Sequence, residues 1–169
     1  MAEKKGDDWG FLEFVALAVV LDVIFKQFPF LASIQPILPI AVLAGILYGG
    51  LRGSAVGVIS AFFSTLFIGS LNFSGNLFFL QAAAGIIAGS LGGLAGKSRN
   101  PSVSEFVSLC VVAAIAFEAL NNFLNGTSFS RLSGYYYLEG TALASALHII
   151  AAIVIALLLS KTLEKNEKI

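Results

Sequence analysis

Residues 107–123 read VSLCVVAAIAFEALNNF, and this stretch indicates both the fold class and the environment of the chain. Its first half carries no charge, which is typical of a helix surrounded by lipid. Glu118 then begins a polar series with Asn121, Asn122 and Asn125, at positions i, i+3, i+4 and i+7 of one helical face. A carboxylate at the centre of a transmembrane helix costs about 2.5–3.5 kcal/mol, even on insertion scales. The polar face therefore predicts part of a small-molecule binding site.

The composition of the whole chain predicts an integral membrane protein. Of its 169 residues, 57% are hydrophobic and 12% are charged, and the mean hydropathy is +0.90. A soluble domain of this length could not cover so much apolar surface with so few charges. The formal net charge is zero, which gives no support to nucleic-acid binding. Cys110 is the only cysteine and lies in an apolar run, so we expect neither a disulfide framework nor a thiol metal site.

We expect an all-α integral membrane bundle of six transmembrane helices that forms a single domain over residues 1–169. A helix needs about 20 residues to cross the hydrocarbon of a bilayer. The expected helices cover residues 9–28, 36–51, 54–71, 76–95, 102–123 and 141–160. A short turn at Arg52–Gly53 separates the second helix from the third. Ser102 or Ser104 can cap the start of the fifth helix.

The distribution of lysine and arginine predicts the orientation. In the six-span arrangement only Lys26 and Arg131 fall on one side of the membrane. The other basic residues fall on the opposite side: Lys4, Lys5, Arg52, Lys97, Arg99, Lys161, Lys165 and Lys168. Because cytoplasmic loops carry an excess of such residues, both termini are expected to be cytoplasmic.

Small residues recur every fourth position in two of the expected helices. One series contains Ala41, Gly45, Gly49, Gly53 and Gly57. The other contains Gly85, Gly89 and Gly93. Stripes of this kind allow the backbones of membrane helices to approach closely. We expect packing within the bundle, and the alternative is that one stripe faces a partner subunit.

Polar residues from several segments are expected in the outer half of the bilayer. Gln81 in the fourth helix, Glu118 in the fifth and His148 in the sixth lie roughly 7–10 Å below the outer surface if each residue rises about 1.5 Å. Asp22 lies near the outer end of the first helix. The inner halves of the third, fourth and sixth helices are almost purely apolar, whereas a channel needs polar groups along its full depth. The pattern therefore predicts a pocket that opens to the outside.

The segment between the fifth and sixth helices adds Tyr135, Tyr136 and Tyr137. Aromatic residues at a membrane surface often act as interfacial anchors. Three consecutive tyrosines beside the polar helix face could instead form a stacking wall for a flat ring. Acidic side chains outnumber basic ones around the expected pocket, which favours a neutral or cationic ligand.

Nothing in the sequence indicates an enzyme. The chain lacks Gly-x-Ser-x-Gly, His-Glu-x-x-His and a phosphate-binding loop, and it has a single histidine. A Glu118/His148 acid–base pair is conceivable, but no nucleophile or metal ligand set accompanies it. We therefore expect no catalytic residues, no metal and no cofactor.

Two stretches resemble the S components of ECF-type vitamin transporters. One is PILPI at 36–40 followed by LAGILYGGLRGSAVGVIS at 43–60, and the other is QAAAGIIAGSLGG at 81–93. The chain length, the six expected spans and the two cytoplasmic ends are also similar to that family. One departure concerns the Ala-x-x-x-Ala docking motif in the first helix of many members, because Ala16 is followed by Val20 and Ala18 by Asp22.

The resemblance implies a substrate-capture subunit in the plasma membrane of a prokaryote. Such a subunit binds a vitamin at the outer face and associates with a transmembrane T component and two ABC ATPase subunits. The pocket of the family maps here onto Gln81, Glu118, Asn121, Asn122, Tyr135–Tyr137 and His148.

Two other functions are compatible with the sequence. The first is a structural scaffold subunit similar to the rod-shape protein D family, which also combines glycine-rich turns with short helices but needs no outer polar pocket. The second is a stand-alone ion-coupled carrier that uses Glu118 as a proton site.

Overall fold

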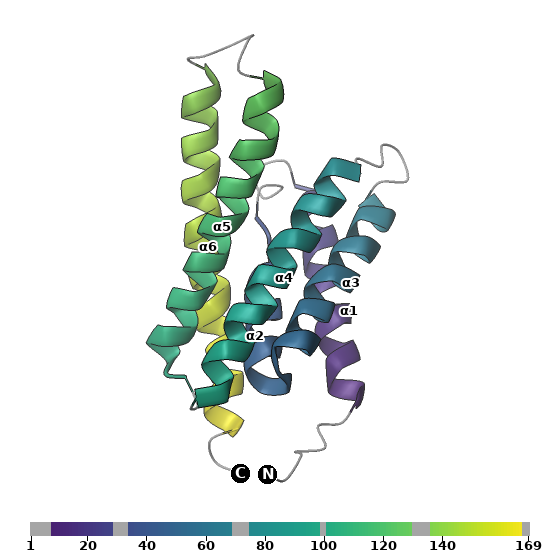
Figure 1. Ribbon diagram of the computed structural model, residues 1–169, viewed down its shortest axis with the longest axis vertical. Helices are drawn as coiled ribbons and strands as arrows, with labels where there is room; N and C mark the ends of the chain where they lie inside the picture. The colour runs from purple at the N-terminus through teal and green to yellow at the C-terminus, as the bar shows by residue number, and fades with distance from the viewer. Residues whose placement is uncertain (1–7, 29–33, 69–74, 99–100, 130–135, 167–169) are drawn as a thin grey trace.

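The computed structural model describes residues 8–28, 34–68, 75–98, 101–129 and 136–166, and in these residues the only regular secondary structure is helical. The prediction of an all-α fold is confirmed. The helices are α1 (Asp8–Lys26), α2 (Ile37–Tyr48), α3 (Gly50–Ile68), α4 (Gly75–Ser98), α5 (Val103–Phe129) and α6 (Tyr136–Asn166). They alternate in direction, so that the start of α1 and the end of α6 lie at the same end of the molecule, the lower end in Figure 1.

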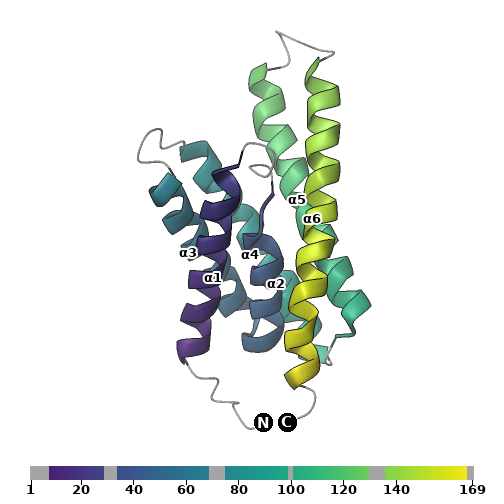
Figure 2. The ribbon, with the colours of Figure 1, turned by 180° about the vertical axis from the view of Figure 1, so that it is seen from behind.

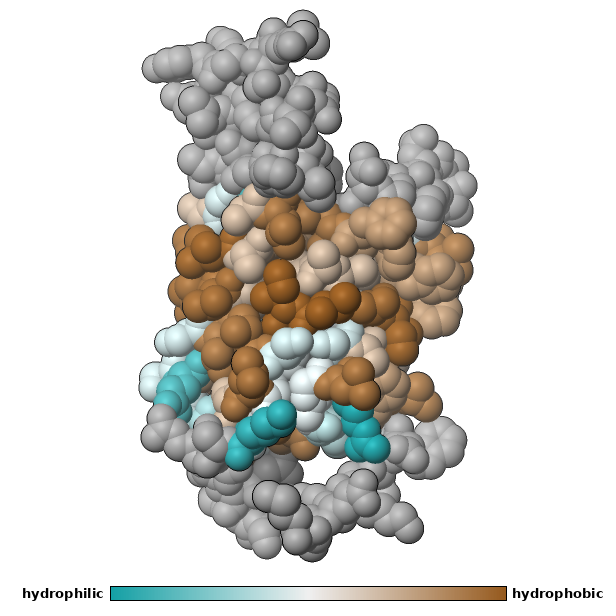
Figure 3. Space-filling model, viewed as in Figure 1, coloured by the Kyte–Doolittle hydropathy of each residue, from teal (hydrophilic) through white to brown (hydrophobic). Residues whose placement is uncertain are grey.

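Four of these helices are long and apolar enough to cross a membrane. Within the residues whose side chains are described, the apolar stretches are Gly50–Ile68, Phe78–Lys97, Val103–Asn121 and Ser145–Leu163. A band of apolar side chains covers the middle of the face seen in Figure 3, and hydrophilic side chains lie below it. These features are those of a multi-pass membrane protein.

The remaining two helices do not meet the same criteria by themselves. Helix α2 has 12 residues. At about 1.5 Å per residue it is only about 18 Å long, whereas the hydrocarbon of a bilayer is roughly 30 Å thick. Helix α1 has 19 residues but contains Glu13, Asp22 and Lys26. Six separate spans therefore remain a prediction, whereas four helices have the required length and composition.

Helix α2 forms the centre of the molecule. Every residue from Ile37 to Gly45 is buried, as expected for a helix that is apolar on all sides. One side of α2 joins a hydrophobic cluster that includes residues of α4, α5 and α6, among them Phe106. Its other side joins a second cluster with residues of α1 and α3, among them Ala18 and Val56. The short helix thus links the two parts of the bundle.

The glycine stripes bring α2, α3 and α4 into backbone contact. A Cβ atom added to Gly57 of α3 would lie 2.5 Å from Cα of Gly85 of α4, and one added to Gly96 would lie 2.5 Å from the carbonyl oxygen of Ile46 in α2. These distances are too short for a side chain, so only glycine allows this packing. The expectation of close packing inside the bundle is therefore met within one chain.

The turn between α2 and α3 differs from the prediction. The helical path breaks at Gly49, which has φ of +93°, a conformation that residues with a Cβ rarely adopt. Arg52 and Gly53, which we expected to form the turn, lie in the first turns of α3. The sequence offers both Gly49 and Gly50 for the turn, and in the structure Gly49 has the positive φ while Gly50 begins α3.

Helices α5 and α6 form a long antiparallel pair that rises above the other helices (Figures 1 and 2). The cap of α5 follows the prediction: the backbone N–H of Ser102 donates to Glu105 Oε2 at 2.8 Å, and Ser102 Oγ accepts from the Glu105 N–H at 3.3 Å. This reciprocal arrangement is a capping box.

The upper ends of the pair lie beyond the predicted boundaries. Helix α5 continues to Phe129 and α6 begins at Tyr136, although we expected ends near 123 and 141. Gly126 and Gly140 lie just outside the expected helices, but a single glycine inside a helix costs only about 1 kcal/mol. Tyr136 and Tyr137 therefore belong to the first turn of α6, and their assignment to a loop is wrong.

Candidate functional site

The carboxylate of Glu118 binds two side chains of α6. Glu118 Oε1 lies 2.8 Å from His148 Nδ1, and Ser145 Oγ donates a hydrogen bond to Glu118 Oε2 at 2.7 Å. Ser145 and His148 are three residues apart, so they lie on the same face of α6. One carboxylate on α5 thus joins two positions of the neighbouring helix, and we call Glu118, Ser145 and His148 the Glu118 cluster.

The Glu118 cluster is largely shielded from solvent. The side chain of His148 is 1% exposed and that of Glu118 is 13% exposed. The ring of Phe117 packs against His148 at a centroid distance of 5.1 Å and an interplanar angle of 85°. Because the environment is apolar, each hydrogen bond in the cluster is stronger, and each missing one more costly, than at a water-exposed surface.

The Glu118 cluster lies on two helices that are apolar enough to cross a membrane. Glu118 is in the apolar stretch Val103–Asn121 of α5, and Ser145 and His148 are in the apolar stretch Ser145–Leu163 of α6. Three asparagines follow Glu118 along α5, at positions 121, 122 and 125. The chain thus becomes more polar from Glu118 toward the upper end of α5, opposite to the end at which α5 begins and α6 ends (Figure 1).

One polar atom of the cluster has no partner. His148 Nε2 is buried and, within the described part of the chain, is the only buried side-chain nitrogen or oxygen without a hydrogen bond. Buried polar atoms in native proteins almost always have a partner, since leaving one without a hydrogen bond costs about 1–3 kcal/mol. An unsatisfied nitrogen beside a buried carboxylate indicates a place where a further molecule can bind.

Gln81 has hydrogen bonds of a different kind. Its Nε2 donates to Gln35 Oε1 at 2.9 Å, and its Oε1 accepts from Thr65 Oγ1 at 3.4 Å. These bonds connect α4 to α3 and to the segment before α2, and they do not involve Glu118 or His148. Both polar atoms of the Gln81 side chain are thus hydrogen-bonded inside the protein, so its predicted contact with a ligand stays a prediction.

Asp22 also binds within the α1–α4 part of the molecule. Its Oδ1 lies 2.8 Å from Lys26 Nζ, one helical turn further along α1, and its Oδ2 accepts a hydrogen bond from Ser64 of α3. Asp22 is fully buried and the side chain of Lys26 is 9% exposed. Lys26 neutralises the charge of Asp22, and the hydrogen bond from Ser64 attaches α1 to α3, which is a sufficient structural role.

The other residues predicted for the site lie on the upper parts of α5 and α6. Asn121 is partly buried on α5, one turn beyond Glu118. Asn122, Asn125, Tyr136 and Tyr137 lie in α5 or α6, and their side chains are outside the described part of the structure. Tyr135 lies entirely outside the described residues. The asparagines nevertheless share a continuous helix with Glu118, as their spacing predicted.

Sequence reasoning missed Ser145. A serine in an apolar helix is common and carries no cost that would mark it as functional. Its position three residues before His148 was the available signal, because this spacing places both side chains on one face. Sequence reasoning also missed Gln35, which lies before the start of α2 and follows no helical pattern.

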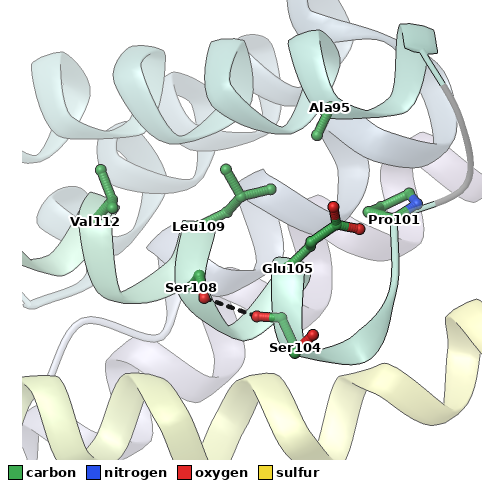
Figure 4. A pocket seen from close by; sticks show the side chains of 7 residues that line it. All are labelled: Ala95, Pro101, Ser104, Glu105, Ser108, Leu109 and Val112. Carbon is green, nitrogen blue, oxygen red and sulfur yellow. Dashed lines mark hydrogen bonds between the residues drawn. The ribbon is translucent and has the colours of Figure 1, made fainter.

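A groove of about 340 Å³ lies elsewhere, between the end of α4 and the start of α5 (Figure 4). It is lined by Ala95, Pro101, Ser104, Glu105, Ser108, Leu109 and Val112. Its polar groups already serve the helix: Glu105 belongs to the capping box, and Ser108 Oγ donates to the carbonyl oxygen of Ser104 at 2.8 Å. The groove contains none of the predicted site residues, and its chemistry is that of a helix start.

In the described part of the chain no three His, Cys, Asp or Glu side chains are grouped so that they could hold a metal ion. Comparisons with protein families, with curated proteins and with solved structures find no match to this chain.

Proposed function

We propose that this chain is a membrane-embedded subunit that captures a small water-soluble molecule, with the Glu118 cluster as the centre of its binding site. The observation that carries the proposal is the pairing of Glu118 with His148 within the apolar stretches of α5 and α6, with a buried histidine nitrogen left for a further partner. At the depth that the sequence predicts for these residues, a site can be reached from the aqueous surface and still be shielded from water.

The energetics of the cluster support a binding role. An ionisable pair in the apolar part of a membrane protein is costly, and a hydrophobic pair of the same volume would hold α5 and α6 together at least as well. Helix association alone does not require Glu118 and His148. Their presence is accounted for if the carboxylate and the imidazole recognise polar groups of a solute.

The charge of the cluster favours a neutral or cationic solute. Within the described part of the chain, Glu118 accepts a hydrogen bond from Ser145 and contacts His148 Nδ1, and it pairs with no lysine or arginine. The ammonium of Lys26 on α1 is paired with Asp22. An anionic solute would therefore meet a carboxylate that no cation neutralises.

The more specific form of the proposal is an S component of an ECF-type importer that takes up a vitamin or a related compound. It is supported by the sequence likeness of residues 36–60 and 81–93 and by the all-helical fold in which the start of α1 and the end of α6 lie together. In this form the chain works with a transmembrane T component and ABC ATPase subunits in a prokaryotic plasma membrane, with its lower end in the cytoplasm.

Native mass spectrometry of the detergent-purified protein tests the binding function directly. We expect a small molecule to co-purify with the wild-type chain. The Glu118→Gln variant should retain about 10- to 100-fold less of it, because a hydrogen bond to a charged group contributes about 1.5–3 kcal/mol.

The matched control is Glu105→Gln, which makes the same chemical change on the same helix but in the capping box. This variant should retain the molecule at the wild-type level. Equal retention in the Glu118→Gln and wild-type proteins would contradict the proposed site. Asn122→Ala tests the extension of the site along α5, and we expect it also to lose the molecule while the protein stays folded.

Reconstitution separates the subunit from a stand-alone carrier. The purified chain in liposomes should bind the solute without accumulating it, since the chain contains no nucleotide-binding motif of its own. Proton-driven accumulation by the chain alone would favour the ion-coupled carrier. Co-purification of a T component or an ABC ATPase with a tagged chain would favour the importer subunit.

A further inference from the structure

We infer that His148 Nε2 accepts a hydrogen bond from the captured solute, so that the solute carries an N–H or O–H donor at this position. The inference rests on the proposed function and makes His148 a specificity-determining residue. It follows from the location of the imidazole proton when Glu118 is ionised and accepts from both of its neighbours in the Glu118 cluster.

The first step concerns Nδ1. An ionised carboxylate has only acceptor atoms. Glu118 Oε2 already accepts from the Ser145 hydroxyl at 2.7 Å, and Oε1 lies 2.8 Å from His148 Nδ1. Both contacts are satisfied together when Glu118 is ionised and the imidazole carries its proton on Nδ1. The partner of one ring nitrogen thus selects the tautomer.

The second step concerns Nε2. In the neutral imidazole with a proton on Nδ1, Nε2 has a lone pair and no hydrogen, so it is an acceptor. An imidazolium would instead place a charged N–H donor at Nε2. Leaving such a donor without a hydrogen bond in a side chain that is 1% exposed costs more than leaving a neutral acceptor unused. In the neutral imidazole that donates from Nδ1, Nε2 is therefore the unused acceptor of the solute-free protein.

The third step concerns what can bind to that lone pair. A carboxylate behind an imidazole is also a common arrangement around metal ions. A metal site needs further ligands, however, and the described residues provide no group of three His, Cys, Asp or Glu. A hydrogen-bond donor on an organic solute needs no additional ligand. We expect the site to bind solutes that have this donor much more tightly than solutes that lack it, because a solute without the donor would leave Nε2 buried and unpaired.

Nitrogen NMR of protein labelled at its histidine nitrogens tests the first two steps. The chain has one histidine, so one Nδ1 and one Nε2 resonance are expected. At neutral pH in the solute-free protein, Nδ1 should be of the protonated type and Nε2 of the unprotonated type. Glu118→Gln should increase the share of the opposite tautomer, and Ser145→Ala, which leaves the contact between Glu118 and His148 in place, should not.

Two small probes test the third step. Pyrrole has an N–H donor and no nitrogen acceptor, and N-methylpyrrole lacks this donor. We expect pyrrole to shift the Nε2 resonance in a saturable manner toward that of a hydrogen-bonded acceptor, and N-methylpyrrole to shift it at least tenfold less at the same concentration. A protonated Nε2 in the solute-free protein would overturn the inference, and so would equal responses to the two probes, including no response to either.

The outcomes separate this inference from the proposed function. If the chain captures a solute that depends on Glu118 but Nε2 is protonated, the function stands and the inference fails. If no solute co-purifies and Glu118→Gln changes nothing, the proposed function fails whatever the NMR spectra show.

Discussion

The glycine-packed unit of α2, α3 and α4 and the α5–α6 pair are held together by different atoms. In the unit, backbones touch: an added Cβ at Gly57 would lie 2.5 Å from Cα of Gly85. In the pair, the side chain of Glu118 reaches across to Ser145 and His148. Backbone contact leaves no room for a solute between α3 and α4, whereas the α5–α6 contact is made by polar side chains that can bind one.

The two regions also differ in how their polar groups are satisfied. In the α1–α4 part, Asp22 is bound by Lys26 and Ser64, and Gln81 by Gln35 and Thr65. In the α5–α6 pair, His148 Nε2 has no partner. The first region resembles a closed structural core, and the second is the place where the chain can still form a contact. Three substitutions test this division through the stability of the protein, and Glu118→Gln tests it through solute binding.

The largest loss of stability is expected for Asp22→Asn. This change leaves the ammonium of Lys26 without its carboxylate, and breaking a buried ion pair costs about 3–5 kcal/mol of unfolding free energy. The double variant Asp22→Asn/Lys26→Met should recover most of that loss, because it removes the unpaired charge. Denaturant unfolding in detergent, followed by circular dichroism, measures both.

The same variants show whether the two regions are separate. In the folded Asp22→Asn protein the nitrogen resonances of His148 should stay as in the wild type. A change of tautomer at His148 would mean that the α1–α4 part and the α5–α6 pair are coupled, and the division described above would be wrong.

A smaller loss is expected for Gly57→Ala. The new methyl group would meet the backbone of Gly85, which cannot move aside as a side chain could. Overpacking of this kind costs about 1–3 kcal/mol of stability. Thermal unfolding of the purified wild-type and Gly57→Ala proteins measures this loss of stability.

Gly50→Ala is the matched control for that prediction. A Cβ at Gly50 would have its nearest neighbours at 3.6 Å, an ordinary contact distance. The free energy of unfolding of this variant should lie within about 0.5 kcal/mol of that of the wild type. If the two glycine variants were equally stable, close backbone packing would not be what holds α3 to α4.

The smallest effect is expected for Ser145→Ala. It removes one hydrogen bond from Glu118 Oε2 and should cost about 1 kcal/mol of stability. It should also reduce solute retention less than Glu118→Gln does, since the carboxylate and its contact with His148 remain. Ser108→Ala is the control, because Ser108 Oγ donates only to the carbonyl oxygen of Ser104 in its own helix. If Ser108→Ala lowered stability and solute retention as much as Ser145→Ala does, the hydrogen bond from Ser145 to Glu118 would have no specific role in the site.

Features that depend on neighbouring residues along the chain were predictable. The apolar composition indicates a membrane protein, and the described residues form helices. The Ser102 cap follows from a serine three residues before Glu105, which is a local pattern. The four-residue glycine repeat predicts close helix packing because a helix returns to the same face every three to four residues.

Helix ends and partners were less predictable. The break at Gly49 and the extension of α6 back to Tyr136 could not be predicted from the local sequence, since a glycine can end a helix or lie inside it. The sequence placed Gln81 and His148 at similar depth, but depth along the membrane does not determine the direction of a side chain around its helix.

Composition and periodicity alone were thus sufficient for the all-helical class, the glycine contacts in general and the polar face of Glu118. Only the folded arrangement decided that Glu118 meets Ser145 and His148, that Gln81 pairs with Gln35, and that His148 Nε2 is left without a partner. The physical reason is that a helix repeat specifies which residues share a face. The rotation and the register of one helix against another result from packing over the entire bundle.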